Sequence, residues 1–70
     1  MDAAEWLATY AAELGVAPPD EETVERLLEL AGIAAHSSER IAAPITTWLV
    51  GVAGLDVEQA LELGRRLSSD

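Results

Sequence analysis

The chain has 70 residues, and its thirteen acidic residues outnumber its four basic ones, which gives a formal net charge of -9. This charge opposes binding to a phosphate backbone or to an anionic membrane, since both attract clustered cationic side chains, so we expect no nucleic-acid partner and no membrane partner. Cysteine is absent, which excludes a disulfide scaffold and thiolate chemistry.

The first predicted helix spans Ala3–Leu14. Asp2 and Glu5 have the spacing of a capping box, in which each side chain accepts a hydrogen bond from a backbone N–H at the helix start. Apolar residues then recur on one helical face, and Gly15 can adopt the left-handed conformation that closes a helix. The proline pair at 18–19 prevents continuation and predicts a turn.

The second predicted helix begins at the acidic residues 20–22, whose charge suits the positive end of the helix dipole. It ends near His36, because the serines at 37–38 favour caps and turns. Its apolar stripe is wide enough to contact two neighbours, which predicts a central helix. Within that helix, Gly32 is expected to permit close approach of another backbone. We interpret its acidic face as a solvated surface, with the docking of a basic partner as the alternative, and this face comprises Glu21, Glu22, Glu25 and Glu29.

The third predicted helix has Pro44 in its first turn, where the missing N–H breaks no hydrogen bond. It ends near Gly54. Residues 46–50 have side chains that also suit a β-strand, but no second alternating run is present to pair with them. We therefore predict a helix here.

The fourth predicted helix opens at Asp56, which has the capping-box spacing with Gln59. We expect Glu62 to pair with Arg65 or Arg66 one turn later. Residues 68–70 should fray.

These elements predict an all-α fold, a compact bundle of about four short helices in one domain over residues 1–70. The large pieces of its core are expected to be Trp6, Tyr10 and Trp48. A chain of this size buries little surface, so we expect a homo-oligomer or contact with another chain. No cationic start followed by an apolar stretch opens the sequence, and we expect a cytoplasmic protein.

The sequence contains no paired catalytic motif, no phosphate-binding glycine loop and no Cys/His cluster, so we expect no enzymatic activity, no catalytic residue and no cofactor. His36 is the single histidine. A metal site needs three or four converging ligands, and we therefore predict none. Ser37 and Ser38 beside this histidine are interpreted as helix caps rather than nucleophiles.

The candidate binding site is the polar corner between the second and third helices. Arg40 can bind an anion or anchor an interface, and the hydroxyl groups of Thr46 and Thr47 can bind a ligand. In the structural alternative, Arg40 caps the carbonyls of the second helix and the threonines satisfy the first turn of the third. The candidate binding set is His36, Arg40, Thr46 and Thr47, and the candidate interface residues are Glu39 and Trp48.

The segments "EWLATYAAELGV" at residues 5–16 and "AAHSSERIAAPITTWLVGVAG" at residues 34–54 carry a family resemblance. The chain resembles a small actinobacterial domain family of unknown function, in which Trp48 stands where phenylalanine is usual. Members occur singly or fused C-terminally to a molybdenum cofactor guanylyltransferase, often beside genes for formate dehydrogenase maturation. The pattern matches here at His36, Arg40, Ala43, Pro44, Thr46, Thr47, Leu49 and Gly51.

The resemblance implies a partner, either a molybdenum cofactor nucleotidyltransferase or a formate dehydrogenase accessory protein. We therefore expect a non-enzymatic accessory or protein-interaction module. The alternative is a small-molecule or anion-binding helical domain, which would use the corner formed by His36, Arg40, Thr46 and Thr47.

Overall fold

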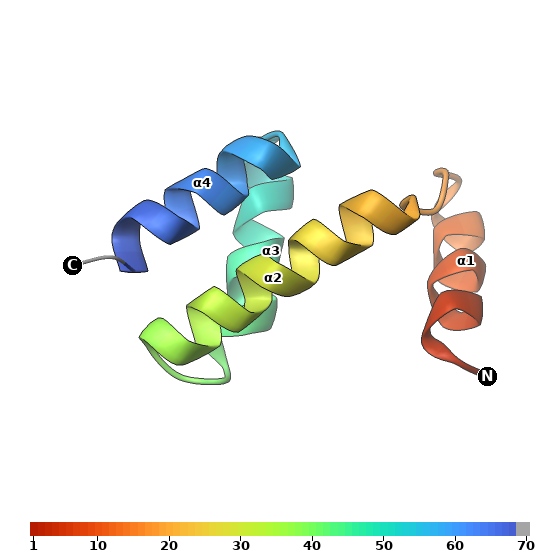
Figure 1. The fold of residues 1–70 in the computed structure, drawn as a ribbon. Coiled ribbons are helices and arrows are strands. Elements are labelled where there is room, and N and C mark those ends of the chain that lie inside the picture. Colours follow the sequence, from red (N-terminus) through yellow and green to blue (C-terminus); the bar gives the residue numbers. More distant parts are fainter. Residues whose placement is uncertain (69–70) are drawn as a thin grey trace.

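The computed structural model describes residues 1–68. Over this range the chain forms four helices, α1 (Ala3–Leu14), α2 (Glu21–Ser37), α3 (Ala42–Ala53) and α4 (Val57–Ser68), and no strand (Figure 1). The predicted all-α bundle of about four short helices is confirmed. The fraying expected at residues 69 and 70 lies outside the described residues, whereas Ser68 belongs to the last turn of α4.

The ends of α1 are where the sequence predicts them. The backbone N–H of Glu5 donates to Asp2 Oδ1 at 2.8 Å, and the N–H of Asp2 donates to Glu5 Oε1 at 3.3 Å, so the capping box is complete. Gly15 has a φ of 76°, and its N–H donates to the carbonyl oxygens of Ala11 and Ala12. A left-handed φ is readily adopted by glycine because it lacks Cβ, and α1 therefore closes here.

α2 is the central helix of the fold, as predicted. It starts at the cap residue Asp20, whose Oδ1 accepts the N–H of Thr23 at 2.8 Å. At its other end, the N–H of Ser38 donates to the carbonyl of Ala34 at 3.1 Å. Between these ends α2 packs against both α3 and α4, because its apolar stripe is wide enough to serve two neighbours.

The buried core lies between α2 and α4 and is extended by α3. Leu30 of α2 is 3% exposed and packs with Ala60 and Leu61 of α4. Ile33, Val50 and Leu55 surround this group. Removing a leucine-sized side chain from water contributes about 1.5–3 kcal/mol, so these few residues hold the three C-terminal helices together.

Close approach between helices occurs at Gly64 of α4 and not at Gly32 of α2, which corrects the expectation from the sequence. A Cβ atom built on Gly32 would have no neighbouring atom within 4 Å in the described part of the chain. A Cβ atom on Gly64 would lie 2.7 Å from Leu30 Cδ1. Where α4 crosses α2 determines which glycine allows the two helices to approach closely. The position of this crossing cannot be predicted from the apolar periodicity of one helix.

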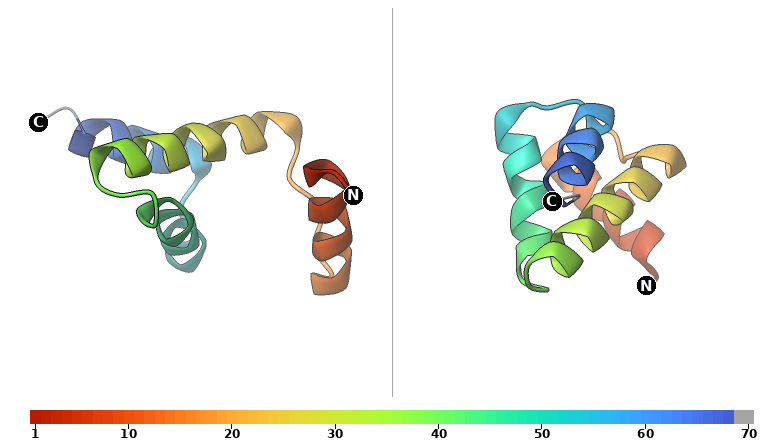
Figure 2. Two further views of the ribbon diagram at one scale, coloured as in Figure 1. Left: turned by 90° about the horizontal axis from the view of Figure 1, so that it is seen from below. Right: turned by 60° about the vertical axis from the view of Figure 1, so that its left-hand side comes forward.

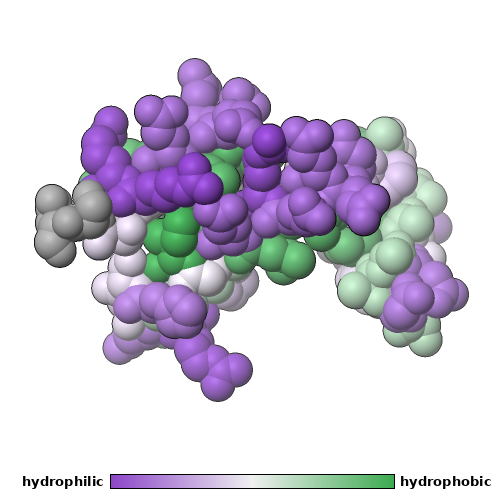
Figure 3. Space-filling view, in the orientation of Figure 1, coloured by the Kyte–Doolittle hydropathy of each residue, from purple (hydrophilic) through white to green (hydrophobic). Residues whose placement is uncertain are grey.

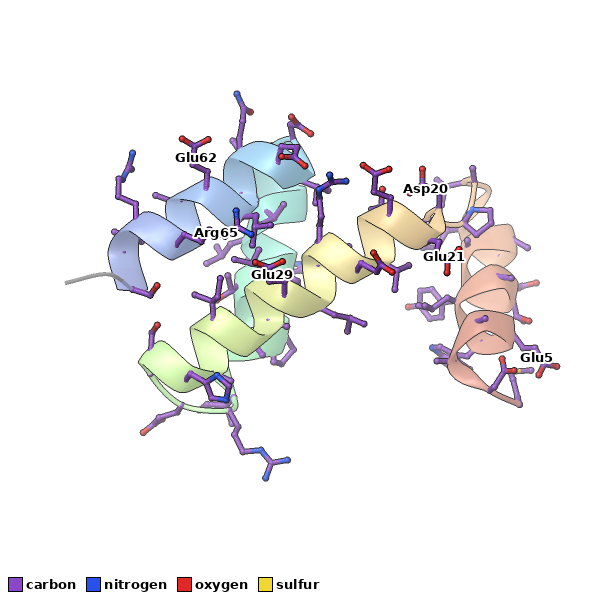
Figure 4. All side chains as sticks on the ribbon, viewed as in Figure 1. Glu5, Asp20, Glu21, Glu29, Glu62 and Arg65 are labelled. Atoms are coloured by element: carbon purple, nitrogen blue, oxygen red, sulfur yellow. The ribbon has the colours of Figure 1, made fainter. Side chains whose placement is uncertain are left out.

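At the start of α4 the expected capping box is incomplete, and further along α4 Arg65 has a partner other than Glu62. Asp56 Oδ1 accepts the N–H of Glu58 at 3.4 Å, and within residues 1–68 no reciprocal bond from Gln59 completes a capping box. Arg65 Nη2 lies 2.5 Å from Glu29 Oε2 of α2, so it pairs across the helices. In Figure 4 these two side chains point toward one another, whereas Glu62 lies on the side of α4 turned away from α2.

α1 lies at the N-terminal end of α2, apart from α3 and α4 (Figures 1 and 2). The radius of gyration is 12.6 Å, whereas a close-packed domain of this length is expected near 11 Å. α1 and α3 both project from the same side of α2, which is clearest in the left view of Figure 2. The bundle around the core therefore consists of α2, α3 and α4, with α1 as an attached arm.

Candidate functional site

The candidate corner is distributed over two helices and their connection. His36 lies in the last turn of α2, Arg40 lies in the connection, and Thr46 and Thr47 lie near the start of α3. The side chains of His36 and Arg40 are exposed, and neither has a hydrogen bond or an ion pair within the part of the chain that the structure describes. These residues lie along the connection between α2 and α3 and the helix ends beside it, but Arg40 does not cap the carbonyls of α2.

The two threonines of α3 have different surroundings. Thr47 Oγ1 donates to the carbonyl of Pro44 at 2.8 Å, which is the structural role considered for it. Thr46 lines a cavity of about 190 Å³ between the C-terminal half of α2, the start of α3 and the end of α4, together with the serines at 37–38. His36, Arg40 and Thr47 do not line this cavity. The structure does not gather the four candidate residues around one hollow, and their binding role stays a prediction.

The backbone of the connection starts α3 without a side-chain cap. The N–H of Ala42 donates to the carbonyl of Glu39 at 2.9 Å, and the N–H of Ala43 donates to the carbonyl of Arg40 at 3.2 Å. These bonds satisfy donors that a helix start leaves free. The main chain of Glu39 and Arg40 thus shapes the corner, while both residues are exposed.

An apolar face of α3 is open to solvent. Its members recur at the spacing of one helical face, and Trp48 among them is 64% exposed. α3 contains no charged residue. We call this surface the α3 outer face, and it consists of Ile45, Trp48, Leu49 and Val52.

A second apolar face lies on α1. Trp6 and Tyr10 are 56% and 54% exposed, and their ring centroids are 5.8 Å apart. We call this surface the α1 outer face, and it consists of Trp6, Leu7, Tyr10 and Leu14. The expectation that Trp6, Tyr10 and Trp48 are core residues is wrong, because no helix of the described chain covers either face.

A further apolar area lies beneath α2 (Figure 3). Figure 3 shows hydrophobic side chains exposed beneath α2, between α1 and the rest of the molecule. Leu28 of α2 is 67% exposed. Isolated exposed leucines are ordinary, but contiguous apolar patches on a small protein mark interaction surfaces.

Many of the charged residues lie on the opposite side of α2 and on α4, where Figure 3 is predominantly hydrophilic. Arg26 of α2 pairs with Glu22 one turn earlier and with Glu58 of α4. The hydrogen bond to Glu22, together with the charges of both carboxylates, raises the pKa of Arg26. The two arginines that pair across α2 and α4, Arg26 and Arg65, thus bind carboxylates of the acidic face, so part of that face serves the fold.

A profile for a domain of unknown function, DUF6457, matches residues 1–69. The chain belongs to this family. No curated protein and no solved structure gives a significant match.

In this DUF6457 chain, sequence reasoning placed Trp6 and Tyr10 in the core and so missed the exposure of the α1 outer face, and it named Trp48 as the one aromatic interface candidate. The sequence feature that could have indicated this surface is the apolar stripe of α1, a helix that a proline pair separates from the rest of the chain. Within residues 1–68, no group of three or more His, Cys, Asp or Glu side chains is arranged to hold a metal ion. None of the described helices is both long enough and apolar enough to cross a membrane.

Proposed function

We propose that this DUF6457 chain is a non-enzymatic protein-interaction module that acts as an accessory in molybdenum cofactor nucleotide transfer or formate dehydrogenase maturation. The observation that supports the interaction role is the α3 outer face, an uncharged stripe with an exposed tryptophan on a helix that packs against the core. Tryptophan and tyrosine are enriched among the residues that dominate binding energy at interfaces. The class of partner comes from the family resemblance.

The experiment is an affinity capture from the organism that encodes the chain, with the full chain as bait and mass spectrometry as the readout. A bait that carries Ile45→Glu and Trp48→Glu removes the apolar character of the α3 outer face without touching the core. Glu62→Gln, an exposed substitution on α4, serves as the matched control.

We expect wild type and Glu62→Gln to recover a molybdenum cofactor nucleotidyltransferase or a formate dehydrogenase accessory protein, and the doubly substituted bait to lose it. Recovery of neither protein by any bait contradicts the accessory role. Equal recovery by all three baits contradicts the assignment of the interface to the α3 outer face.

A further inference from the structure

The chain exposes more surface than a folded monomer of its mass. Its accessible surface is 5449 Å², whereas a monomeric protein of 7.4 kDa is expected to expose about 4,200 Å². The excess is about 1,200 Å², and a stable protein–protein interface buries about 800 Å² on each partner. The surface that the chain exposes in excess is therefore large enough to be covered by a stable dimer interface.

The α1 outer face does not reach the α3 outer face of its own chain. α1 joins α2 near Glu21, which at helical rise is about 14 Å along α2 from Leu30, where the core anchors the bundle. Packed helices have axes about 8–10 Å apart. Pro18 and Pro19 in the connection have fixed φ angles, which limits how far α1 can swing.

We infer that the occupant of both outer faces is a second copy of this chain, with α1 of each copy packed against α3 of the other. The inference rests on the proposed function in treating these faces as an interface, and it adds the occupant of the resting state: a cofactor-transfer protein would bind the α3 outer face only of a chain released from the dimer. A two-fold axis makes the contact twice and covers both faces of both chains. α1 and α3 project from the same side of α2, so the α1 helix of one copy enters the open side of the other (Figure 2).

The distribution of charge permits this contact despite the net charge of -9 per chain. α3 has no ionisable residue. The paired arginines and the carboxylates they bind lie on α2 and α4, on the charged side of the molecule. In the dimer, the carboxylates of α2 and α4 therefore stay in solvent, where salt screens them, and Glu5 and Glu13 of α1 meet no like charge on α3.

The first measurement is the molar mass of the purified full chain by sedimentation velocity across a wide concentration range. We expect the mass to rise from 7.4 kDa toward twice that value. Trp6→Phe and Trp48→Phe variants each retain one tryptophan, and we expect each emission to shift to shorter wavelength as the dimer forms. A monomer at every concentration overturns the inference. If the tryptophans of such a monomer are shielded, α1 has instead closed on its own α3.

A mixing experiment tests the specific pairing of α1 with α3. One variant carries Trp6→Glu and Tyr10→Glu, the other carries Ile45→Glu and Trp48→Glu, and all four residues are exposed in the free chain, so circular dichroism should show both variants helical. Each variant alone has no intact α1–α3 contact, and we expect both to be monomers. Their mixture has one intact contact, and we expect it to contain a heterodimer.

The outcomes separate this inference from the proposed function. A dimer in either separate variant, or monomers in the mixture, overturns the exchange of α1 between copies. A wild-type monomer that still captures a cofactor-transfer protein overturns the inference and leaves the proposed function standing. A wild-type dimer that captures no such protein overturns the proposed function and leaves the inference standing.

Discussion

Leu30 Cδ1 occupies the space that a side chain at Gly64 would take, since a Cβ atom there would lie 2.7 Å from it. Leu30 is 3% exposed and belongs to the core, so a methyl group at position 64 would displace a core side chain. The contact between α2 and α4 depends on this one missing side chain.

Alanine substitutions at two glycines should therefore have opposite effects. Gly32→Ala meets no neighbour and gains helix propensity, which should raise the free energy of unfolding by about 0.5–1 kcal/mol. Gly64→Ala gains the same propensity, but forcing a methyl group into the core costs about 1–3 kcal/mol. We expect a net loss of about 1 kcal/mol, measured by urea unfolding. Stabilisation by both substitutions would show that the Leu30 side chain shifts at little cost to make room for the new methyl group.

Removing an arginine should destabilise the chain at position 26 and not at position 40. Arg26→Gln and Arg40→Gln change the net charge equally, but only Arg26 has carboxylate partners in the described chain, on α2 and α4. We expect Arg26→Gln to lower the Tm by up to about 5 °C, and the loss to shrink as salt is added because salt screens the pairs. An equal loss at both positions would mean that net charge, not pairing, is responsible.

Asp20 should make stability depend on acid pH. Hydrogen bonds from the hydroxyl and the backbone N–H of Thr23 lower the pKa of Asp20 below its ordinary value. Because the folded pKa is the lower one, the ionised carboxylate stabilises the fold above the unfolded pKa, and this stabilisation is lost as pH falls through the folded pKa.

The matched variant for this prediction is Asp20→Asn, which keeps an acceptor for the N–H of Thr23 but carries no charge. We expect the wild type to have the higher Tm at neutral pH and the difference to disappear in acid. Thermal scans across acid pH check this, and a difference that stays constant with pH would exclude the charge of Asp20 as its cause.

The effect of inorganic phosphate on the Tm tests whether the corner between α2 and α3 binds anions. Arg40 is exposed and does not line the cavity beside Thr46, so Arg40→Ala should leave the Tm unchanged. We expect phosphate to shift the Tm of wild type and variant equally in thermal unfolding. A phosphate-dependent stabilisation that Arg40→Ala abolishes would establish the corner as an anion site.

Structural features that depend only on residues close together in the sequence could be predicted from the sequence. The bounds of α1 follow from Asp2, Glu5 and Gly15, which act within one turn of the helix. The role of Gly64 and the partner of Arg65 depend on how α4 crosses α2, a relation between segments that are far apart in the sequence.

The same distinction holds for the candidate site. Pro44 and the serines at 37–38 predict a corner between two helices, and the corner is present. The direction of the Arg40 side chain depends on the backbone of the connection. An apolar stripe such as the one around Trp48 predicts a face to be covered, but it does not say whether the same chain covers it.

Because α1 buries little surface, its local stability is lower than that of the other three helices. Ala11 is its buried residue, and a helix of 12 residues is marginal in water without a partner. Its amide protons should therefore exchange through local opening while α2, α3 and α4 stay folded. Covering the arm then couples the ordering of one helix to association, and coupled ordering lowers affinity per unit of buried area. Such an assembly comes apart readily and can be regulated through a single helix.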